Sequence, residues 1–223
     1  MADKSSSPYE NEAMERINLH TPLSIRSSFA FPLQSSTNRR DVMIGGLWLL
    51  VPVVGWLLNM GHRITFVHNM MHGRAPMPAW NSYRNLLRHG SVTFLAMVYY
   101  YLPAMLLAAY YAVAPNLFIA IAAAAFFLTA TILIPGYMSH YCVDFGIAQM
   151  FNVRASFAHV RASGRAYWHA WMIAITALAL SFTGILFLGV GFLFTSVWFW
   201  QVAGFSFATV MAQRHALTMR TST

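Results

Sequence analysis

SVTFLAMVYYYLPAMLLAAYYAV (91–113) is the first of three consecutive pieces of sequence that decide the fold of this chain. The other two are the tripeptide APN (114–116) and the stretch LFIAIAAAAFFLTATILIPGYM (117–138). Each long stretch lacks charged residues and can cross the hydrocarbon core of a bilayer as a helix, which takes about 20 residues. The uncharged link between them leaves room only for a tight turn. We therefore expect two antiparallel transmembrane helices here, Ser91–Val113 and Leu117–Met138.

A second pair of apolar stretches follows, and we expect spans at Trp168–Leu188 and Val190–Gln213 with a tight uncharged link at Gly189. The whole chain is 58% hydrophobic and only 9% charged, which fits neither an ordinary soluble domain nor a disordered chain. The sequence thus predicts an all-α integral membrane protein with four transmembrane helices in two hairpins.

The first apolar stretch, residues 43–60, differs from these spans because Pro52 and Gly55 interrupt its centre. It is either one kinked span or a re-entrant helical hairpin, which a membrane permits only where protein buries it. A single span would place Arg39 and Arg40 on the side opposite the next basic loop. Because basic residues gather on the cytoplasmic side, they favour the hairpin.

The distribution of charge predicts the orientation. From Met43 onward Asp144 is the only carboxylate, while arginines fall in alternate gaps between the apolar stretches. We expect a prokaryotic cytoplasmic (inner) membrane protein whose main basic loops and C-terminus are cytoplasmic. The net charge of +8 is spread over the tail and these loops, which favours contact with anionic lipid headgroups over nucleic acid.

Two short amphipathic segments, near 83–90 and 157–164, precede the second and third spans with Arg opposite an apolar face. They are typical of helices lying in the headgroup layer. We expect contacts with the membrane surface or a partner from nearby basic and tryptophan residues. These are Arg63, Arg74, Trp80, Arg84, Arg88, Arg154, Arg161, Arg165, Trp168, Trp198 and Trp200.

Composition divides the chain into three parts: a polar tail (1–42), one membrane domain (43–213) and a short C-terminal tail (214–223). The N-terminal tail carries too little apolar surface to fold alone, so we expect it to be flexible, to lie on the membrane or to be held by a partner protein. Its segment 28–33, with Phe29 and Phe31, is expected at the membrane interface.

Two pairs at helical spacing are the candidate metal ligands. His68 and His72 are four residues apart, as are His140 and Asp144, so each pair would share one helix face. If the loops converged, three or four nitrogen and oxygen ligands would meet. No Glu follows His68, so the zinc-protease pattern is absent. The commoner explanation is two histidines at the membrane surface and an acid paired with arginine, and we predict no metal.

The sequence contains no motif that is typical of haem or chlorophyll binding or of catalysis. Haem iron and chlorophyll magnesium are normally bound by a histidine inside a span, and the interiors of the expected spans contain none. No nucleophile elbow, phosphate-binding glycine-rich loop or pair of acids at useful spacing occurs. We therefore predict that the chain is not an enzyme.

Several glycine, proline and aromatic motifs resemble a widespread family of small prokaryotic membrane proteins known only as a domain of unknown function. They are Phe29-Ala30-Phe31-Pro32, Ile44-Gly45-Gly46-Leu47, Pro52-Val53-Val54-Gly55, Gly61-His62-Arg63, Gly73, Met77-Pro78-Ala79-Trp80, Leu86-Leu87, Gly90, Tyr101-Leu102-Pro103, Phe157, Val160 and Tyr167. The resemblance covers roughly residues 29–213 and implies a fold but no activity. The chain departs from the family pattern at His62, Thr65 and His68.

Our leading hypothesis is a non-catalytic integral membrane subunit that assembles or stabilises a larger complex, and a photosynthetic or respiratory assembly is a candidate host. Its surplus of aromatic surface has to face lipid or other membrane protein subunits. The alternative is a small-solute transporter or channel, with a polar path reaching Thr131, Ser181 or Thr183. A third hypothesis is a metal- or tetrapyrrole-binding membrane protein.

Overall fold

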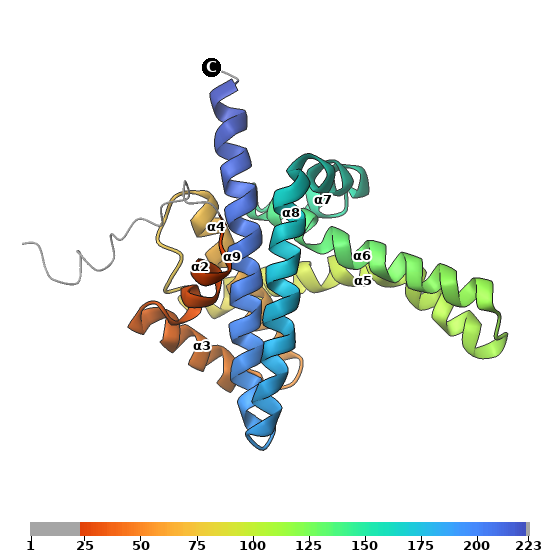
Figure 1. The fold of residues 1–223 in the computed structure, drawn as a ribbon, viewed down its shortest axis with the longest axis horizontal. Helices are drawn as coiled ribbons and strands as arrows, with labels where there is room; N and C mark the ends of the chain where they lie inside the picture. Colours follow the sequence, from red (N-terminus) through yellow and green to blue (C-terminus); the bar gives the residue numbers. More distant parts are fainter. Residues whose placement is uncertain (1–22, 222–223) are drawn as a thin grey trace, which may run out of the picture.

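Three antiparallel helical hairpins form the protein (Figure 1). The computed structural model describes the backbone of residues 23–221 and the side chains of residues 23–212. In this part all regular elements are helices, two of them (η1 and η2) of the 3-10 type. They are α2 (Ile25–Ala30), η1 (Phe31–Leu33), α3 (Ser36–Trp48), α4 (Val54–Met71), α5 (Tyr83–Val113), α6 (Leu117–Asp144), α7 (Ile147–Met150), α8 (Val153–Ser181), η2 (Phe182–Leu186) and α9 (Val190–Thr221).

The four expected spans are confirmed. Helices α5, α6, α8 with η2, and α9 are each long and apolar enough to cross a membrane. Helix α5 ends at Val113 and α6 begins at Leu117, so the APN link is the tight turn that the sequence predicts. Helix α9 continues to Thr221, so most of the predicted C-terminal tail is helical in its backbone.

The interrupted segment, residues 43–60, forms the tip of a helical hairpin between α3 and α4. Asn59 of α4 donates from Nδ2 to the carbonyl oxygen of Gly45 in α3 at 3.1 Å, and Gly55 packs directly on the backbone of Trp48. The contacts pair Gly45 with Asn59 and Trp48 with Gly55, so a later residue of α3 meets an earlier residue of α4. The two helices are therefore antiparallel. Val53, with φ 65°, reverses the chain.

The α3–α4 hairpin packs along α9 with its tip toward the α8–α9 turn. A Cβ on Gly45 would meet Val197, and one on Gly46 would meet Phe194, nearer that turn. Residues 43–60 thus lie in a helical hairpin. Helices α3 and α4 are not among the four candidate spans.

Helix α5 starts earlier than predicted because it packs backbone to backbone on α4. A Cβ on Gly61 would lie 1.9 Å from the carbonyl oxygen of Leu86, and a Cβ on Gly90 would lie 1.9 Å from that of Leu57. Small residues allow helices to approach this closely. The predicted separate surface helix at 83–90 is therefore wrong, since these residues are the first turns of α5.

The second predicted surface helix is separate from its span. Gly164 has φ 53° and ψ −135°, outside the helical region, and it kinks α8. Glycine adopts such angles at little steric cost. Residues 153–163 thus run in another direction from the remainder of α8.

Residues 23–42 of the predicted polar tail pack on the helices that follow. Phe31 is buried, and its ring stacks on that of Phe205 at a centroid distance of 4.5 Å. Ser206 Oγ donates to Ser28 Oγ in the buried region at 3.1 Å. Segment 28–33 therefore packs on α9 of the same chain. The rest of the predicted tail, residues 1–22, lies outside the described residues.

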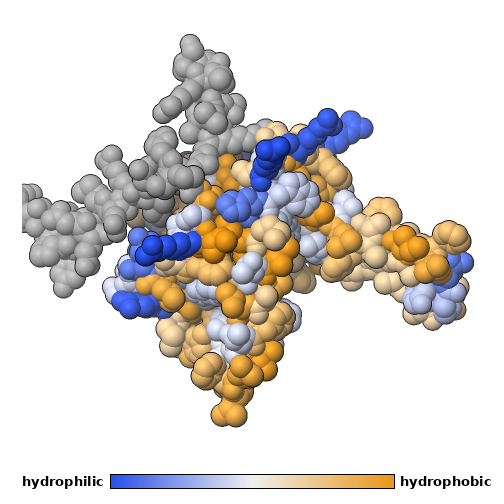
Figure 2. All heavy atoms as spheres, in the orientation of Figure 1, coloured by the Kyte–Doolittle hydropathy of each residue, from blue (hydrophilic) through white to orange (hydrophobic). Residues whose placement is uncertain are grey.

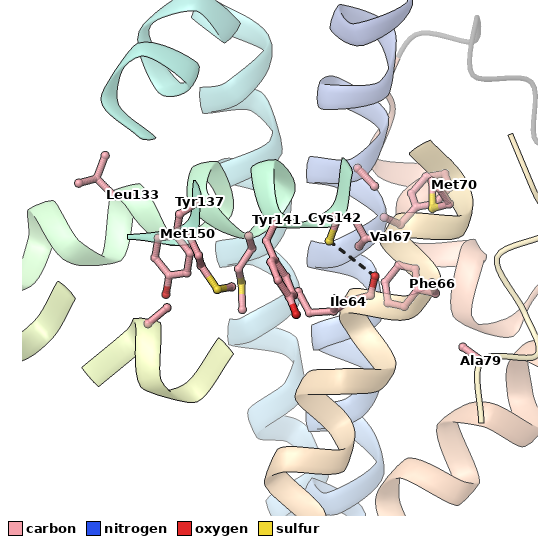
Figure 3. Packing of buried hydrophobic residues seen from close by; sticks show 14 of the residues in the cluster. Ile64, Phe66, Val67, Met70, Ala79, Leu133, Tyr137, Tyr141, Cys142 and Met150 are labelled. Carbon is pink, nitrogen blue, oxygen red and sulfur yellow. Dashed lines mark hydrogen bonds between the residues drawn. The ribbon is translucent and has the colours of Figure 1, made fainter. Parts of the chain in front are cut away.

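The main buried cluster lies where α4 and α6 cross (Figure 3). Tyr141 of α6 lies beside Ile64 of α4, whereas Tyr137 of α6 stacks on Tyr100 of α5, and Tyr137, Tyr141 and Ile64 are almost fully buried. Cys142 Sγ donates to the carbonyl oxygen of Ile64 at 3.6 Å, which fixes the end of α6 on α4. A second cluster joins α8 to α9 around Tyr167 and Phe207.

Beyond this junction the α5–α6 hairpin projects alone. Figure 1 shows it pointing away from the α8–α9 hairpin, and none of residues 105–129, here named the outer arm, is buried. In the view of Figure 2, apolar side chains cover most of the arm and the lower end of the α8–α9 hairpin, whereas strongly hydrophilic residues lie along the top and the left side of the body and at the tip of the arm. The arm thus presents a large apolar surface.

Candidate functional site

A buried acid–histidine pair joins α3 to α4. Asp41 Oδ2 lies 3.0 Å from His62 Nε2, and both side chains are 2% exposed. Because an ionised carboxylate only accepts hydrogen bonds, the His62 ring donates from Nε2. The ring of His62 also stacks on that of Trp80 at 4.5 Å.

The same carboxylate holds the loop between α4 and α5. The backbone N–H of Ala79 donates to Asp41 Oδ2 at 3.0 Å, and Trp80 Nε1 donates to the backbone oxygen of Asp41 at 3.1 Å. Asp41 therefore connects three segments that are distant in sequence. Oδ2 of Asp41 already accepts hydrogen bonds from two buried donors, so the role of this carboxylate is structural: it holds the three segments together.

Arg63, the residue that follows His62, is buried, which contradicts our prediction that it contacts the membrane surface or a partner. Its side chain is only 9% exposed, the guanidinium carbon lies 4.3 Å from the centre of the Trp200 ring, and Nη2 lies 3.7 Å from Met138 Sδ. Burial lowers the pKa of Arg63 to about 10. Packing between α6 and α9 explains the difference, because a local pattern does not show which face of α4 these helices cover.

Polar atoms without a partner lie beside this guanidinium. Arg63 Nε, the Tyr137 hydroxyl and both amide atoms of Gln201 are buried and accept or donate no hydrogen bond within the described structure. Gln201 precedes Gly204 by one helical turn, and a Cβ on Gly204 would lie 3.3 Å from Arg63 Cγ. Helices α4, α6 and α9 thus each contribute an unpartnered polar group to the junction.

The predicted pair His68 and His72 lies at the end of α4 with the two rings 4.1 Å apart. His68 Nδ1 is 2.7 Å from the carbonyl oxygen of Cys142, and His72 Nδ1 is 2.8 Å from that of His68. Partial burial lowers the pKa of His68, although the hydrogen bond to Cys142 opposes this shift.

The other predicted pair has different neighbours. The ring of His140 lies 4.6 Å from that of His159, and Asp144 accepts hydrogen bonds from the N–H of Gly146 and from Gln149 Nε2. The ends of α4 and α6 do meet, but they do not form the three- or four-ligand centre considered from sequence. Among the described residues, no group of three or more His, Cys, Asp or Glu could hold a metal ion.

Most of the predicted surface residues are exposed. The exposed set comprises Arg74, Arg84, Arg88, Arg154, Arg161, Arg165, Trp168 and Trp200. Trp80 and Trp198 are half-buried, and each donates from Nε1 to a backbone oxygen, of Asp41 and Phe29 respectively. These two tryptophans therefore have a packing role within the chain.

Sequence reasoning missed Asp41 because it was grouped with the acids of the polar tail. One available signal was its position directly before the apolar stretch that begins at Met43. An acid so placed can lie in the same helix as the apolar residues. Its partner His62 gave no local signal, because the two residues meet only after the hairpin closes.

Comparison with known proteins gives one match. The family model described as "Protein of unknown function (DUF4013)" matches residues 44–194, which confirms the family resemblance over that range. No curated protein and no solved structure matches the chain. Because the matched residues make up more than half of the chain, the protein belongs to the family described as protein of unknown function (DUF4013).

Proposed function

We propose that this protein is a non-catalytic integral membrane subunit that assembles or stabilises a larger membrane complex, and that the outer arm is its docking element. The observation that carries the proposal is the lack of any buried residue in 105–129. Phe118 near the tip, for example, is 81% exposed. Apart from the packing of α5 against α6, the chain thus leaves the arm uncovered.

The direction of the arm supports a protein neighbour in addition to lipid. Transmembrane helices tilt by roughly 0–40° from the bilayer normal, whereas the two hairpins diverge widely in Figure 1. At least one of the two hairpins is therefore strongly tilted if both cross one flat bilayer. The chain buries no residue of the outer arm, so a neighbouring membrane helix can pack along it.

The surface chemistry of the arm suits a helix of another subunit. Alanines 122–125 provide small side chains, which let helices approach closely in lipid. Tyr110 and Tyr111 are exposed near its end, and tyrosine is enriched at protein interfaces. The partner class is therefore an apolar membrane helix.

The polar groups of the core support a non-catalytic role. Asp41 and His62 bond to each other inside the α3–α4 hairpin, and the Cys142 thiol is buried against Ile64. Three hydroxyls would line the polar path of a transporter, and each donates to a backbone carbonyl oxygen of its own or the preceding helix. Thr131 donates to Phe127, Ser181 to Leu178 and Thr183 to Leu180.

We further propose that all three hairpin tips face away from the cytoplasm of a prokaryotic cell. The tips at 49–53, 114–116 and 187–189 carry no charge, whereas exposed arginines lie at the opposite ends. The positive-inside rule then places the arginine ends in the cytoplasm. On this orientation the α3–α4 hairpin enters the membrane and returns.

A photo-crosslinking residue placed in the native membrane tests the docking role. With the probe at Leu106 or Phe118, both exposed on the arm, we expect a single discrete crosslink to another membrane protein that also co-purifies in mild detergent. The matched control is Leu188, which is 97% exposed at the α8–α9 turn and should give no such product. Crosslinks to lipid alone, or only to a second copy of the chain, together with a monodisperse unpartnered protein, would contradict the proposal.

A further inference from the structure

The end of α4 presents two histidines that are hydrogen-bonded through the same ring atom, Nδ1. In both His68 and His72 the Nδ1 atom lies within hydrogen-bond distance of a carbonyl oxygen. A carbonyl oxygen only accepts, so each ring carries its proton on Nδ1. The neutral form of each imidazole therefore leaves the lone pair on Nε2 unprotonated.

This arrangement is the one that prepares a histidine to bind a metal. Metal-bound histidines almost always donate their second ring N–H to a carbonyl, a carboxylate or water, which fixes the tautomer and the ring orientation. The two rings are 4.1 Å apart and on consecutive turns. His72 is exposed and His68 is partly exposed, so an ion can reach them from solvent.

A third histidine lies nearby but is held apart. His89 stacks on Phe145 at 4.2 Å, and His68 also stacks on Phe145 at 4.2 Å. His89 also bonds through Nδ1 to the Tyr141 hydroxyl at 2.8 Å. The Phe145 ring therefore separates His68 from His89 and leaves two protein ligands.

We propose that His68 and His72 together bind one divalent late transition-metal ion through their Nε2 atoms, with water completing the coordination. Imidazole suits zinc, nickel and copper, and the affinity order of these ions places Cu²⁺ first. The site is independent of the proposed docking role, because it lies at the C-terminal end of α4 and the outer arm does not contribute to it.

The test is a titration of the purified full-length chain with Cu²⁺ and, separately, Zn²⁺, followed by competition with a chromogenic chelator. We expect one site per chain that binds Cu²⁺ more tightly. His68→Ala and His72→Ala should each weaken it about 10-fold or more, since even the loss of an outer-shell partner costs about 10–100-fold. His169→Ala is the matched control, because His169 is an exposed histidine on α8, and it should leave the site unchanged.

A charge variant separates this site from adventitious binding. Arg74 lies close enough for its charge to act on His68, and a positive charge repels a metal cation. Arg74→Ala should therefore tighten Cu²⁺ binding while a melting curve shows the fold intact. Binding that persists unchanged in His68→Ala or in His72→Ala, or a wild-type chain that binds no more tightly than the double variant, would overturn the proposal.

Discussion

Removal of the Asp41 carboxylate should loosen three segments at once. Asp41 is 1% exposed, and its Oδ2 accepts from both His62 Nε2 and the N–H of Ala79. Asp41→Ala leaves both donors buried without an acceptor. An unsatisfied buried donor costs about 1–3 kcal/mol, so the two donors together cost about 2–6 kcal/mol. We expect a loss of about 2–6 kcal/mol in the free energy of unfolding.

Asp41→Asn distinguishes the hydrogen bonds from the charge. Both donors use the same oxygen, so the amide oxygen of Asn can accept from both. Neutral hydrogen bonds are worth about half as much as charged ones, and we expect a loss of only about 1–2 kcal/mol on the same scale. Asp144→Ala removes an exposed carboxylate and should cost about 1 kcal/mol or less.

Thermal unfolding in detergent, followed by tryptophan fluorescence, measures these losses. At about 2–4 °C per kcal/mol for a chain of this size, Asp41→Ala should melt roughly 4–24 °C below the wild type. Hydrogen exchange should show faster exchange of the Ala79 amide in this variant and no change in the outer arm. The reasoning is refuted if Asp41→Ala melts no lower than Asp41→Asn or Asp144→Ala.

Three further results are expected. Gly90→Leu places a side chain where even a Cβ lies 1.9 Å from an α4 carbonyl oxygen, so the variant should lose its monodisperse peak in size-exclusion chromatography. Arg63→Met should change the melting temperature by only a few degrees, because the cation–π contact is worth about 0.5–2 kcal/mol and no described carboxylate pairs with Arg63; a large drop would reveal an anionic partner. Arg84→Cys and Arg161→Cys, both at exposed positions, should react with an impermeant maleimide from the same side of the membrane, and the buried Cys142 should give no background.

The spans and the hairpin turns were predictable because their signals are local. A helix that can cross a membrane needs only a long run of apolar residues, and the links at 114–116 and near Gly189 allow only a sharp reversal. The contrast between the two predicted surface helices shows where local signals end. Gly164 kinks its helix, whereas Gly90 is held straight within α5 by its contact with α4.

The polar junction was not predictable in the same way. Asp41 and His62 are separated by most of the α3–α4 hairpin, and their pairing depends on the hairpin closing in one register. The local sequence around Arg63 is the same as that of an arginine at the membrane surface. Only the folded structure shows that Trp200 and Met138 cover its side chain. Its burial depends on how α6 and α9 pack, which composition and spacing do not encode.

The sequence by itself determined that this is a helical membrane protein with four candidate spans in two hairpins, because hydropathy and turn length act along the chain. The tertiary structure alone decided that residues 23–42 belong to the packed body, that Asp41 latches three segments together, and that the outer arm projects uncovered. These features arise from contacts between helices, and such contacts form only between side chains that folding brings together.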